Sequence, residues 1–176
     1  MLSATPAFAR DVAGVDVPET LSEGGKTLKL NGAGVRKKFV VKVYVGAMYL
    51  ENTSSSAADI LKADQIRVVK MTFVRNVDKA KIMDAYEEGF EKNSKGDLPK
   101  LKPSLDKFRA GLGDMKSGQS MTVSYVPGKG VTIAQQGGAT VTVDADGKLL
   151  SDALLRNWIG GEPADGGLKT AFLAGK

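Results

Sequence analysis

The sequence predicts an α+β fold in which helices pack on one side of an antiparallel sheet. Segments with the alternating apolar pattern of strands recur in both halves of the chain, and short Gly, Pro and Ser turns separate several of them. Segments with helical periodicity lie between the strands and at the end of the chain. The chain has 176 residues and no repeat or linker, which fits one domain with a core large enough to fold without disulfides.

The first half begins with strands. Residues 14–31 predict two short strands around a Ser-Glu-Gly-Gly turn, and residues 35–50 predict one long strand. Alternation divides this long strand into two faces. The expected core face carries Phe39, Val41, Val43, Val45 and Ala47. The other face is mixed and suits a cleft; it carries Lys38, Val40, Lys42, Tyr44, Gly46 and Met48.

Helices follow in the middle of the chain. A short helix with serine caps is predicted over 54–63, before a strand over 66–74. Residues 78–93 place Ile82, Tyr86 and Phe90 at helical spacing, which predicts an amphipathic helix. Residues 93–103 are predicted as a loop, with a second helix beginning near Ser104 after Pro103.

The last third predicts an antiparallel meander followed by two helices. Its strands cover 119–126, 130–136 and 139–147, with Pro-Gly-Lys-Gly as the first turn. A helix beginning near Ser151 packs Leu154, Leu155 and Trp158, and core packing is the expected role of this tryptophan. Residues 166–176 are predicted to form a last short helix.

Composition excludes several classes of function. The chain has neither histidine nor cysteine, which rules out disulfides, thiol catalysis, imidazole-based triads and most zinc sites. The net charge is +5, but lysines and arginines are scattered among acids, so we expect no nucleic-acid binding. No run approaches the about 18 apolar residues of a membrane span.

The N-terminus suggests a cellular compartment. Ala7-Phe8-Ala9 before Arg10 has the small-x-small form of a signal-peptidase site, although an apolar segment does not precede it. We therefore expect residues 1–9 to be the remnant of a signal peptide and 10–176 to be the domain, located in a periplasm or secreted. The alternative is a frayed, alanine-rich terminus.

Two glycine-rich segments resemble phosphate loops but do not fit them. GAGVRK has Lys37 where a dinucleotide fingerprint needs its third glycine, and GGKT at 24–27 has Thr20 where a Walker A loop begins. Each leads into a strand, so neither can direct a helix N-terminus at a phosphate.

Arg36 and Tyr44 are the candidate binding residues. A guanidinium can grip a carboxylate with two hydrogen bonds, and a phenol can add another donor. Neither is a good general base near neutrality, so the pair indicates an anion anchor. The structural alternatives are a surface or salt-bridged arginine and a half-buried cross-strand tyrosine. Tyr49 falls on the opposite face and is expected in the core, and the Glu87-Glu88 pair is expected on a solvated helix face.

Three motifs carry a resemblance to a known family. GAGVR, the strand ending VGAMYLE, and KLLSDALLRNWIGGEP resemble the chalcone isomerase superfamily, above all its bacterial chalcone isomerase-like branch. The resemblance covers about residues 14–173. It implies an open-faced β-sandwich, in which a long antiparallel sheet and a layer of helices enclose a cleft.

The resemblance also implies site residues. Arg36 corresponds to the arginine that faces the ligand's anionic oxygen, and Tyr44 falls where plant enzymes have threonine and fatty-acid binders have tyrosine. Asn157 falls at a cleft-facing serine or threonine. The catalytic tyrosine of the plant enzymes has no counterpart in RNVDKAKIMD, and Tyr86 and Glu87 stand where an asparagine is expected.

These observations lead to two main hypotheses. The first is a non-catalytic, monomeric protein that needs no cofactor and binds a small amphipathic acid, expected to be a fatty acid, with Arg36 and Tyr44 at its carboxylate. The second is an isomerase or intramolecular lyase of the chalcone-flavanone type, in which Arg36 stabilises an oxyanion. A third is an exported structural or partner-binding domain with a vestigial cleft.

Overall fold

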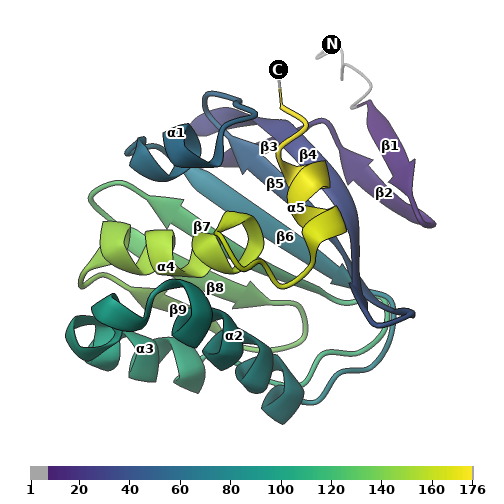
Figure 1. Cartoon of the computed structure of the whole chain (residues 1–176). Coiled ribbons are helices and arrows are strands. Elements are labelled where there is room, and N and C mark those ends of the chain that lie inside the picture. Colours follow the sequence, from purple (N-terminus) through teal and green to yellow (C-terminus); the bar gives the residue numbers. More distant parts are fainter. Residues whose placement is uncertain (1–7, 176) are drawn as a thin grey trace.

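The computed structural model describes residues 8–175, in which a seven-stranded antiparallel sheet is the main element (Figure 1). Each sheet strand pairs with the next one along the chain, so the sheet is a continuous meander. Its strands are β3 (Thr20–Glu23), β4 (Lys26–Lys38), β5 (Val41–Leu50), β6 (Arg67–Phe73), β7 (Ser120–Val126), β8 (Gly130–Gln135) and β9 (Thr140–Val143). A separate hairpin is formed by β1 (Ala9–Val12) and β2 (Val15–Pro18).

Most of the expected signal-peptide remnant, residues 1–7, lies outside the described residues. Of the remaining two, Phe8 accepts a hydrogen bond from the Glu19 amide through its carbonyl oxygen. Ala9 pairs with Pro18 in the β1–β2 hairpin.

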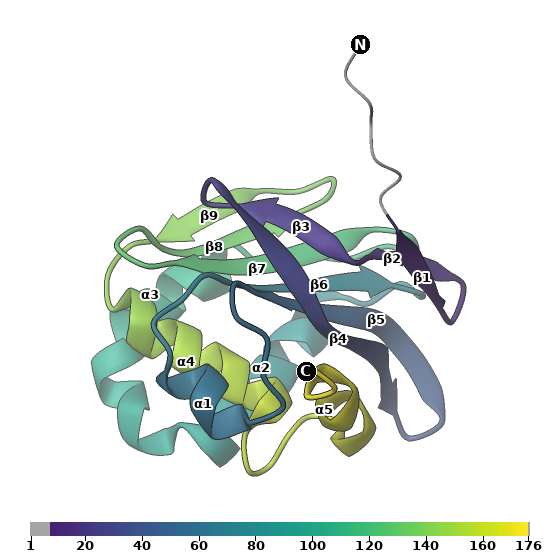
Figure 2. The ribbon, with the colours of Figure 1, turned by 90° about the horizontal axis from the view of Figure 1, so that it is seen from above.

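The helices lie on one face of the sheet, as predicted (Figure 2). They are α1 (Ala57–Lys62), α2 (Lys79–Asn93), α3 (Leu98–Ala110), α4 (Gly147–Ile159) and α5 (Gly166–Phe172), with a 3₁₀ turn η1 (Lys95–Asp97) before α3. The larger apolar cluster fills the space between this layer and the sheet. The predicted stripe of Ile82, Tyr86 and Phe90 on α2 is buried in it, as is Trp158 on α4. None of the helices within residues 8–175 has the length and apolarity needed to cross a bilayer.

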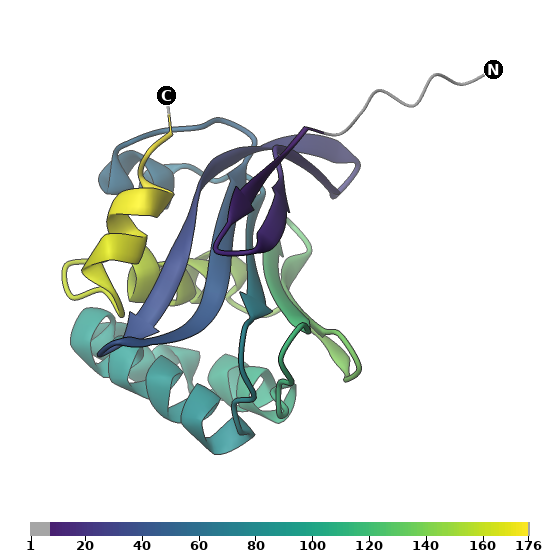
Figure 3. The same ribbon diagram turned by 90° about the vertical axis from the view of Figure 1, so that its right-hand side faces the viewer.

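A smaller apolar cluster lies on the opposite face of the sheet. It joins Val17 of the β1–β2 hairpin to Val45, Ala47 and Tyr49 of β5. Tyr49 is fully buried and donates its hydroxyl to the Pro18 carbonyl, 2.7 Å away, which confirms its predicted core position. The hairpin therefore covers the early strands on this face (Figure 3).

The single long strand predicted over 35–50 is wrong. The chain reverses at Phe39 and Val40, and β4 and β5 form a hairpin in which Lys38 pairs with Val41. Phe39 takes a left-handed φ of 58°, which makes the reversal possible. The predicted faces change as a result. Phe39 and Val41 are exposed instead of being core residues, whereas Tyr44 and Met48 are buried in the larger cluster.

The hairpin brings together the two predicted binding residues. In one extended strand, Arg36 and Tyr44 would be about 26 Å apart, at roughly 3.3 Å per residue. In the observed register they are direct partners on β4 and β5, with Cα atoms expected about 4.5–5.5 Å apart. Both therefore project from the same face of the sheet, toward the helices.

Two helices begin earlier than predicted. The loop expected over 93–103 contains η1 and the start of α3, and Pro103 lies inside that helix. Burial of Leu101 and Leu105 against the core favours the helix despite the hydrogen bond that Pro103 cannot donate. Helix α4 begins at Gly147, because Leu150 is fully buried and its amide already bonds the Asp146 carbonyl at 2.8 Å.

The glycines of GAGVR serve packing. A Cβ at Gly32 would lie 1.9 Å from the Ala171 carbonyl oxygen, and one at Gly34 would lie 2.7 Å from the Ala171 Cβ. Gly46 on β5 faces Phe172 in the same way, at 2.9 Å. Small residues are therefore needed on β4 and β5 for α5 to lie directly on the sheet.

Candidate functional site

A cavity of about 380 Å³ lies between the sheet and helices α2 and α4. This volume is within the range of small-molecule sites. Its buried lining is largely apolar and aromatic, and its exposed lining is rich in charge. The buried residues are Tyr44, Met71, Phe73, Ile82, Tyr86, Met121, Asn157 and Trp158. The exposed residues are Lys38, Phe39, Val41, Arg75, Asn76, Lys81, Asp84, Ala85, Glu88 and Ala164. Arg36, Val43 and Val77 lie between the two groups.

The three predicted site residues, Arg36, Tyr44 and Asn157, all line this cavity. They come from three different elements: β4, β5 and α4. The structure thus brings together residues that are far apart in the sequence, at a place where apolar walls meet a few polar groups.

Arg36 is half-buried at the open side of the cavity. Its Nη1 donates to the Ala164 carbonyl at 3.0 Å and to the Lys37 carbonyl at 3.2 Å. Within residues 8–175, Arg36 forms no ion pair with a carboxylate. Because a guanidinium has five N–H donors, two carbonyl contacts leave it able to bind an anion.

Asp165 is the acid next to Arg36, but its carboxylate is engaged by the backbone. It accepts from the Lys37 amide at 2.8 Å and caps α5 through the Leu168 amide at 3.0 Å. Burial raises the pKa of Asp165, but these amides, that of Gly167 and the charge of Arg36 outweigh burial, so the pKa is lowered overall. Asp165 thus positions the segment that contacts Arg36 and remains ionised there.

Tyr44 lies directly across from Arg36 and is only 7% exposed. Its hydroxyl oxygen accepts a hydrogen bond from Trp158 Nε1, 2.9 Å away. Burial raises the pKa of Tyr44, although the charge of Arg36 and the bond from Trp158 oppose this effect. The residue is therefore a neutral phenol at physiological pH, and its hydroxyl proton can be donated to a ligand oxygen.

Asn157 and Tyr86 are buried polar residues in the cavity wall. Asn157 Nδ2 donates to the Tyr86 carbonyl at 3.4 Å, while its Oδ1 is buried with no hydrogen-bond partner among the described residues. Among the residues that the structure describes, the Tyr86 hydroxyl contacts only weak acceptors, the sulfurs of Met71 and Met121, at 3.8 and 3.9 Å. Burial strongly raises the pKa of Tyr86, so this phenol also remains neutral.

Sequence reasoning missed the roles of Trp158 and Tyr86. Both were expected as core residues on helical stripes, and both are indeed in the core cluster. In addition, Trp158 holds the hydroxyl of Tyr44, and Tyr86 packs edge-on against Trp158 with ring centroids 6.1 Å apart. Helical spacing could not separate these roles, because a cavity wall and a packed core follow the same periodicity.

The charged rim has more cations than anions. Its cations are Arg36, Lys38, Arg75 and Lys81, and its anions are Asp84 and Glu88. Glu88 pairs with Lys92, 2.6 Å away, and its neighbour Glu87 pairs with Arg109 outside the cavity. These acids thus occupy a solvated, salt-bridged helix face, as expected. No group of three or more acidic side chains suited to a metal ion occurs among residues 8–175.

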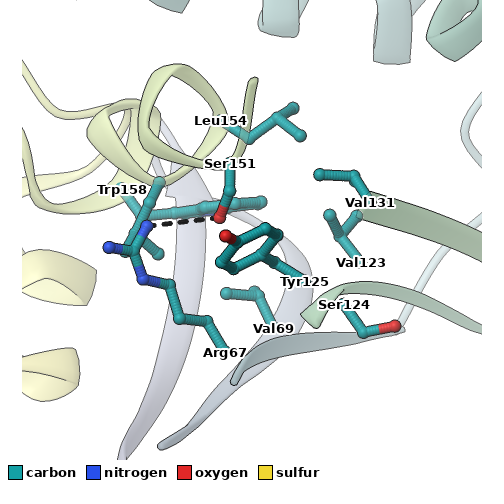
Figure 4. A pocket seen from close by; sticks show the side chains of 10 residues that line it. Arg67, Val69, Val123, Ser124, Tyr125, Val131, Ser151, Leu154 and Trp158 are labelled. Atoms are coloured by element: carbon teal, nitrogen blue, oxygen red, sulfur yellow. Dashed lines mark hydrogen bonds between the residues drawn. The ribbon is translucent and has the colours of Figure 1, made fainter. Parts of the chain in front are cut away.

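A second cavity, next to Arg67, is structural in character (Figure 4). It measures about 20 Å³, which is too small for an organic ligand. Arg67 is 2% exposed and contacts Ser151 Oγ at 3.2 Å, Asp152 Oδ1 at 2.6 Å, and the carbonyls of Ile60, Leu61 and Ala63 at 2.8–2.9 Å. Its donors therefore hold the end of α1 against α4.

Comparisons with known proteins agree with this architecture. The crystal structure of the fatty-acid binding protein AtFAP1 from Arabidopsis thaliana superposes with a TM-score of 0.67, covering 92% of each chain at 18% sequence identity. At that identity, the likeness shows a common fold. No curated protein sequence matches the chain. The chalcone isomerase-like family model matches residues 9–174, nearly the whole chain. The chain therefore belongs to the chalcone isomerase-like family.

Proposed function

We propose that the protein is a non-catalytic carrier of a small amphipathic anion, a fatty acid, with the carboxylate at Arg36 and Tyr44 and the tail in the cavity. The observation that carries this proposal is the pairing of Arg36 with Tyr44 where the buried, mainly apolar lining of the cavity meets its charged rim. The fatty-acid binding neighbour of the same fold supports it.

The two head-group residues have complementary tasks. Arg36 carries a permanent charge and has donors that the protein leaves unused, so it can form charge-assisted hydrogen bonds to a carboxylate. Tyr44 adds a neutral donor that Trp158 holds in place. The excess of cations at the rim attracts an anionic ligand from solution.

The cavity walls suit the tail. Met71, Phe73 and Met121 supply an apolar surface in which methionine can adjust to a chain of variable shape. Each methylene transferred from water into such a site contributes about 0.8 kcal/mol, before the cost of ordering the chain. We therefore expect affinity to rise with chain length until the cavity is full.

A specific observation also favours one alternative, a chalcone-type isomerase. A cation beside a neutral phenol, Arg36 with Tyr44, can stabilise an oxyanion as well as a carboxylate. Tyr44 and Tyr86 are poorly suited to proton transfer near neutrality, because burial raises the pKa of both phenols. We expect no acceleration of chalcone cyclisation at neutral pH. An acceleration that is lost in Arg36→Ala would favour the isomerase.

The carrier proposal is tested by titrating fatty acids into delipidated protein. Trp158 is the single tryptophan and lines the cavity, so its fluorescence should change when the tail enters. The variants are Arg36→Ala and Arg10→Ala. The second removes the same charge from a surface ion pair with Glu19 on the β1–β2 hairpin side of the molecule. Arg36→Ala should bind less tightly and Arg10→Ala like wild type. Absence of binding in wild type, or equal binding without Arg36, would overturn the carrier proposal.

A further inference from the structure

The tip of the β4–β5 hairpin exposes apolar side chains to solvent. Phe39 and Val40 are each 91% exposed, and Val41 is 39% exposed. Apart from Phe8, these are the large apolar side chains that residues 8–175 leave exposed. The tip lies at the edge of the molecule, at the free end of two long strands (Figures 1 and 2). An exposed apolar pair at a protruding turn needs an explanation, because packing supplies none.

The backbone of the tip also argues against a purely structural role. Phe39 has a φ of 58°, at the first central position of a two-residue turn, where glycine is usual. A bulky side chain is strained in this conformation. Phenylalanine at this position is therefore favoured neither by burial nor by the turn, and such outliers gather at functional segments.

Charge surrounds the apolar pair. Lys37, Lys38 and Lys42 are exposed on either side of the tip, and the segment from 36 to 42 contains no acid. The nearest acids belong to other elements. Asp165 is engaged by the amides of Lys37 and Leu168, and Asp84 and Glu88 lie on α2 across the cavity rim. The tip thus presents an apolar pair flanked along the chain by three exposed lysines.

We propose that this tip docks on an anionic lipid surface. Phe39 and Val40 enter the headgroup region, and Lys37, Lys38 and Lys42 contact the lipid phosphates. Lys38, Phe39 and Val41 also line the cavity, so docking places its opening at the membrane. Docking would allow the ligand to be exchanged with that membrane, and this part of the proposal rests on the proposed function. Two side chains at a turn cover far less than the roughly 1,000 Å² of a stable protein interface, which favours lipid over an acidic protein partner.

The experiment is flotation of the full chain with vesicles of phosphatidylcholine, with or without phosphatidylglycerol. Wild type should float with the anionic vesicles, less so as salt is added, and not with phosphatidylcholine alone. The double variant Lys37→Gln/Lys42→Gln should bind the anionic vesicles about thirtyfold more weakly, because each lysine contributes about fivefold to the affinity. Lys95→Gln/Lys100→Gln is the matched control. It removes the same charge from exposed positions at η1 and α3, beyond the far end of α2, and should float like wild type.

Val40→Asp tests the apolar part of docking and should abolish flotation. Val40, Lys37 and Lys42 do not line the cavity, so their variants should bind monomeric decanoate, followed by Trp158 fluorescence, as wild type does. Absence of wild-type flotation, or undiminished flotation of Val40→Asp, would overturn membrane docking whatever the decanoate titration gives. Flotation without decanoate binding would support docking and overturn the carrier function alone.

Discussion

Arg36 and Arg67 are arginines on two strands of one sheet, and their surroundings differ in almost every respect. Arg67, on β6, is 2% exposed, and five protein oxygens accept its N–H groups. Arg36, on β4, is half-buried beside a cavity of about 380 Å³ and donates to two backbone carbonyls. Both Nη groups of Arg67 donate to protein oxygens. Arg36 is held by two backbone carbonyls and keeps N–H groups that no described residue accepts. Arg67 Nε is also buried beside a cavity with no partner among the described residues, so the two arginines differ most in the space next to them, about 380 Å³ at Arg36 and about 20 Å³ at Arg67.

The largest effect should come from Arg67→Met. This change leaves the carbonyls of Ile60 and Ala63 without their buried donor, whereas Leu61 and Asp152 keep a contact with Lys148 Nζ at 2.7 and 2.8 Å. We expect the free energy of unfolding to fall by about 2–5 kcal/mol, measured by chemical denaturation, because each buried acceptor left unsatisfied costs about 1–3 kcal/mol. Arg10→Met, at an exposed ion pair, should change it by less than about 1 kcal/mol. A loss of similar size in both variants would contradict the structural role of Arg67.

Arg36→Ala should show the opposite profile. Fatty-acid affinity should fall by roughly tenfold to a hundredfold, because a charge-assisted contact contributes about 1.5–3 kcal/mol. Stability should change little, since Arg36 is half-buried and its protein partners are carbonyls near the surface. Calorimetric titration and a thermal melt on the same sample separate the two quantities. A large drop in melting temperature with unchanged affinity would make Arg36 a structural arginine as well.

Tyr44→Phe should lie between the two arginine variants. It removes a neutral donor from the proposed head-group site, which should weaken binding by about 0.5–1.5 kcal/mol. It also leaves Trp158 Nε1 buried without its acceptor, so stability should fall by about 1–3 kcal/mol. Binding and denaturation measurements on this variant should therefore both respond. If neither the affinity for the ligand nor the stability changes, the Trp158–Tyr44 contact is dispensable.

Alkaline pH should give the smallest effect. Burial raises the pKa of Tyr44 near Arg36, and it raises that of Tyr125 near Arg67 to about 12. Because these pKa values are higher in the folded chain than the ordinary value near 10, the stabilisation is complete below pH 10 and is lost as the pH rises toward and through the folded values. Melting temperatures measured from pH 8 to 12 should stay level and then decline above about pH 10. Phenolate absorbance that appears well below pH 10 in the folded protein would contradict buried, neutral phenols.

Most of the fold could be predicted from local patterns. Alternation and turn residues identified the meander of β7, β8 and β9, and helical periodicity identified α2 and α5. The β4–β5 hairpin was missed because its turn contains Phe39 and Val40 in place of Gly, Asn or Asp, so alternation ran through it without a break. The early starts of α3 and α4 depend on tertiary burial of Leu101 and Leu150, which no local pattern reports.

The candidate site could be predicted only in part. The family resemblance is the main indication for Arg36, Tyr44 and Asn157, and the structure places all three at one cavity. Their binding roles remain predictions. The bond from Trp158 to Tyr44 depends on the packing of α4 across β5, so it was beyond the reach of sequence patterns.

The partners in this site are widely separated along the chain, and that separation bears on when the site can form. The contact of Arg36 with Ala164 spans 128 positions, and that of Tyr44 with Trp158 spans 114. During synthesis, β4 and β5 leave the ribosome long before α4 and the segment that follows it. A nascent chain therefore contains both strands before it contains Trp158 and Ala164, which contact Tyr44 and Arg36. The contacts that hold Arg36 and Tyr44 in place can therefore form only when the last part of the chain has emerged.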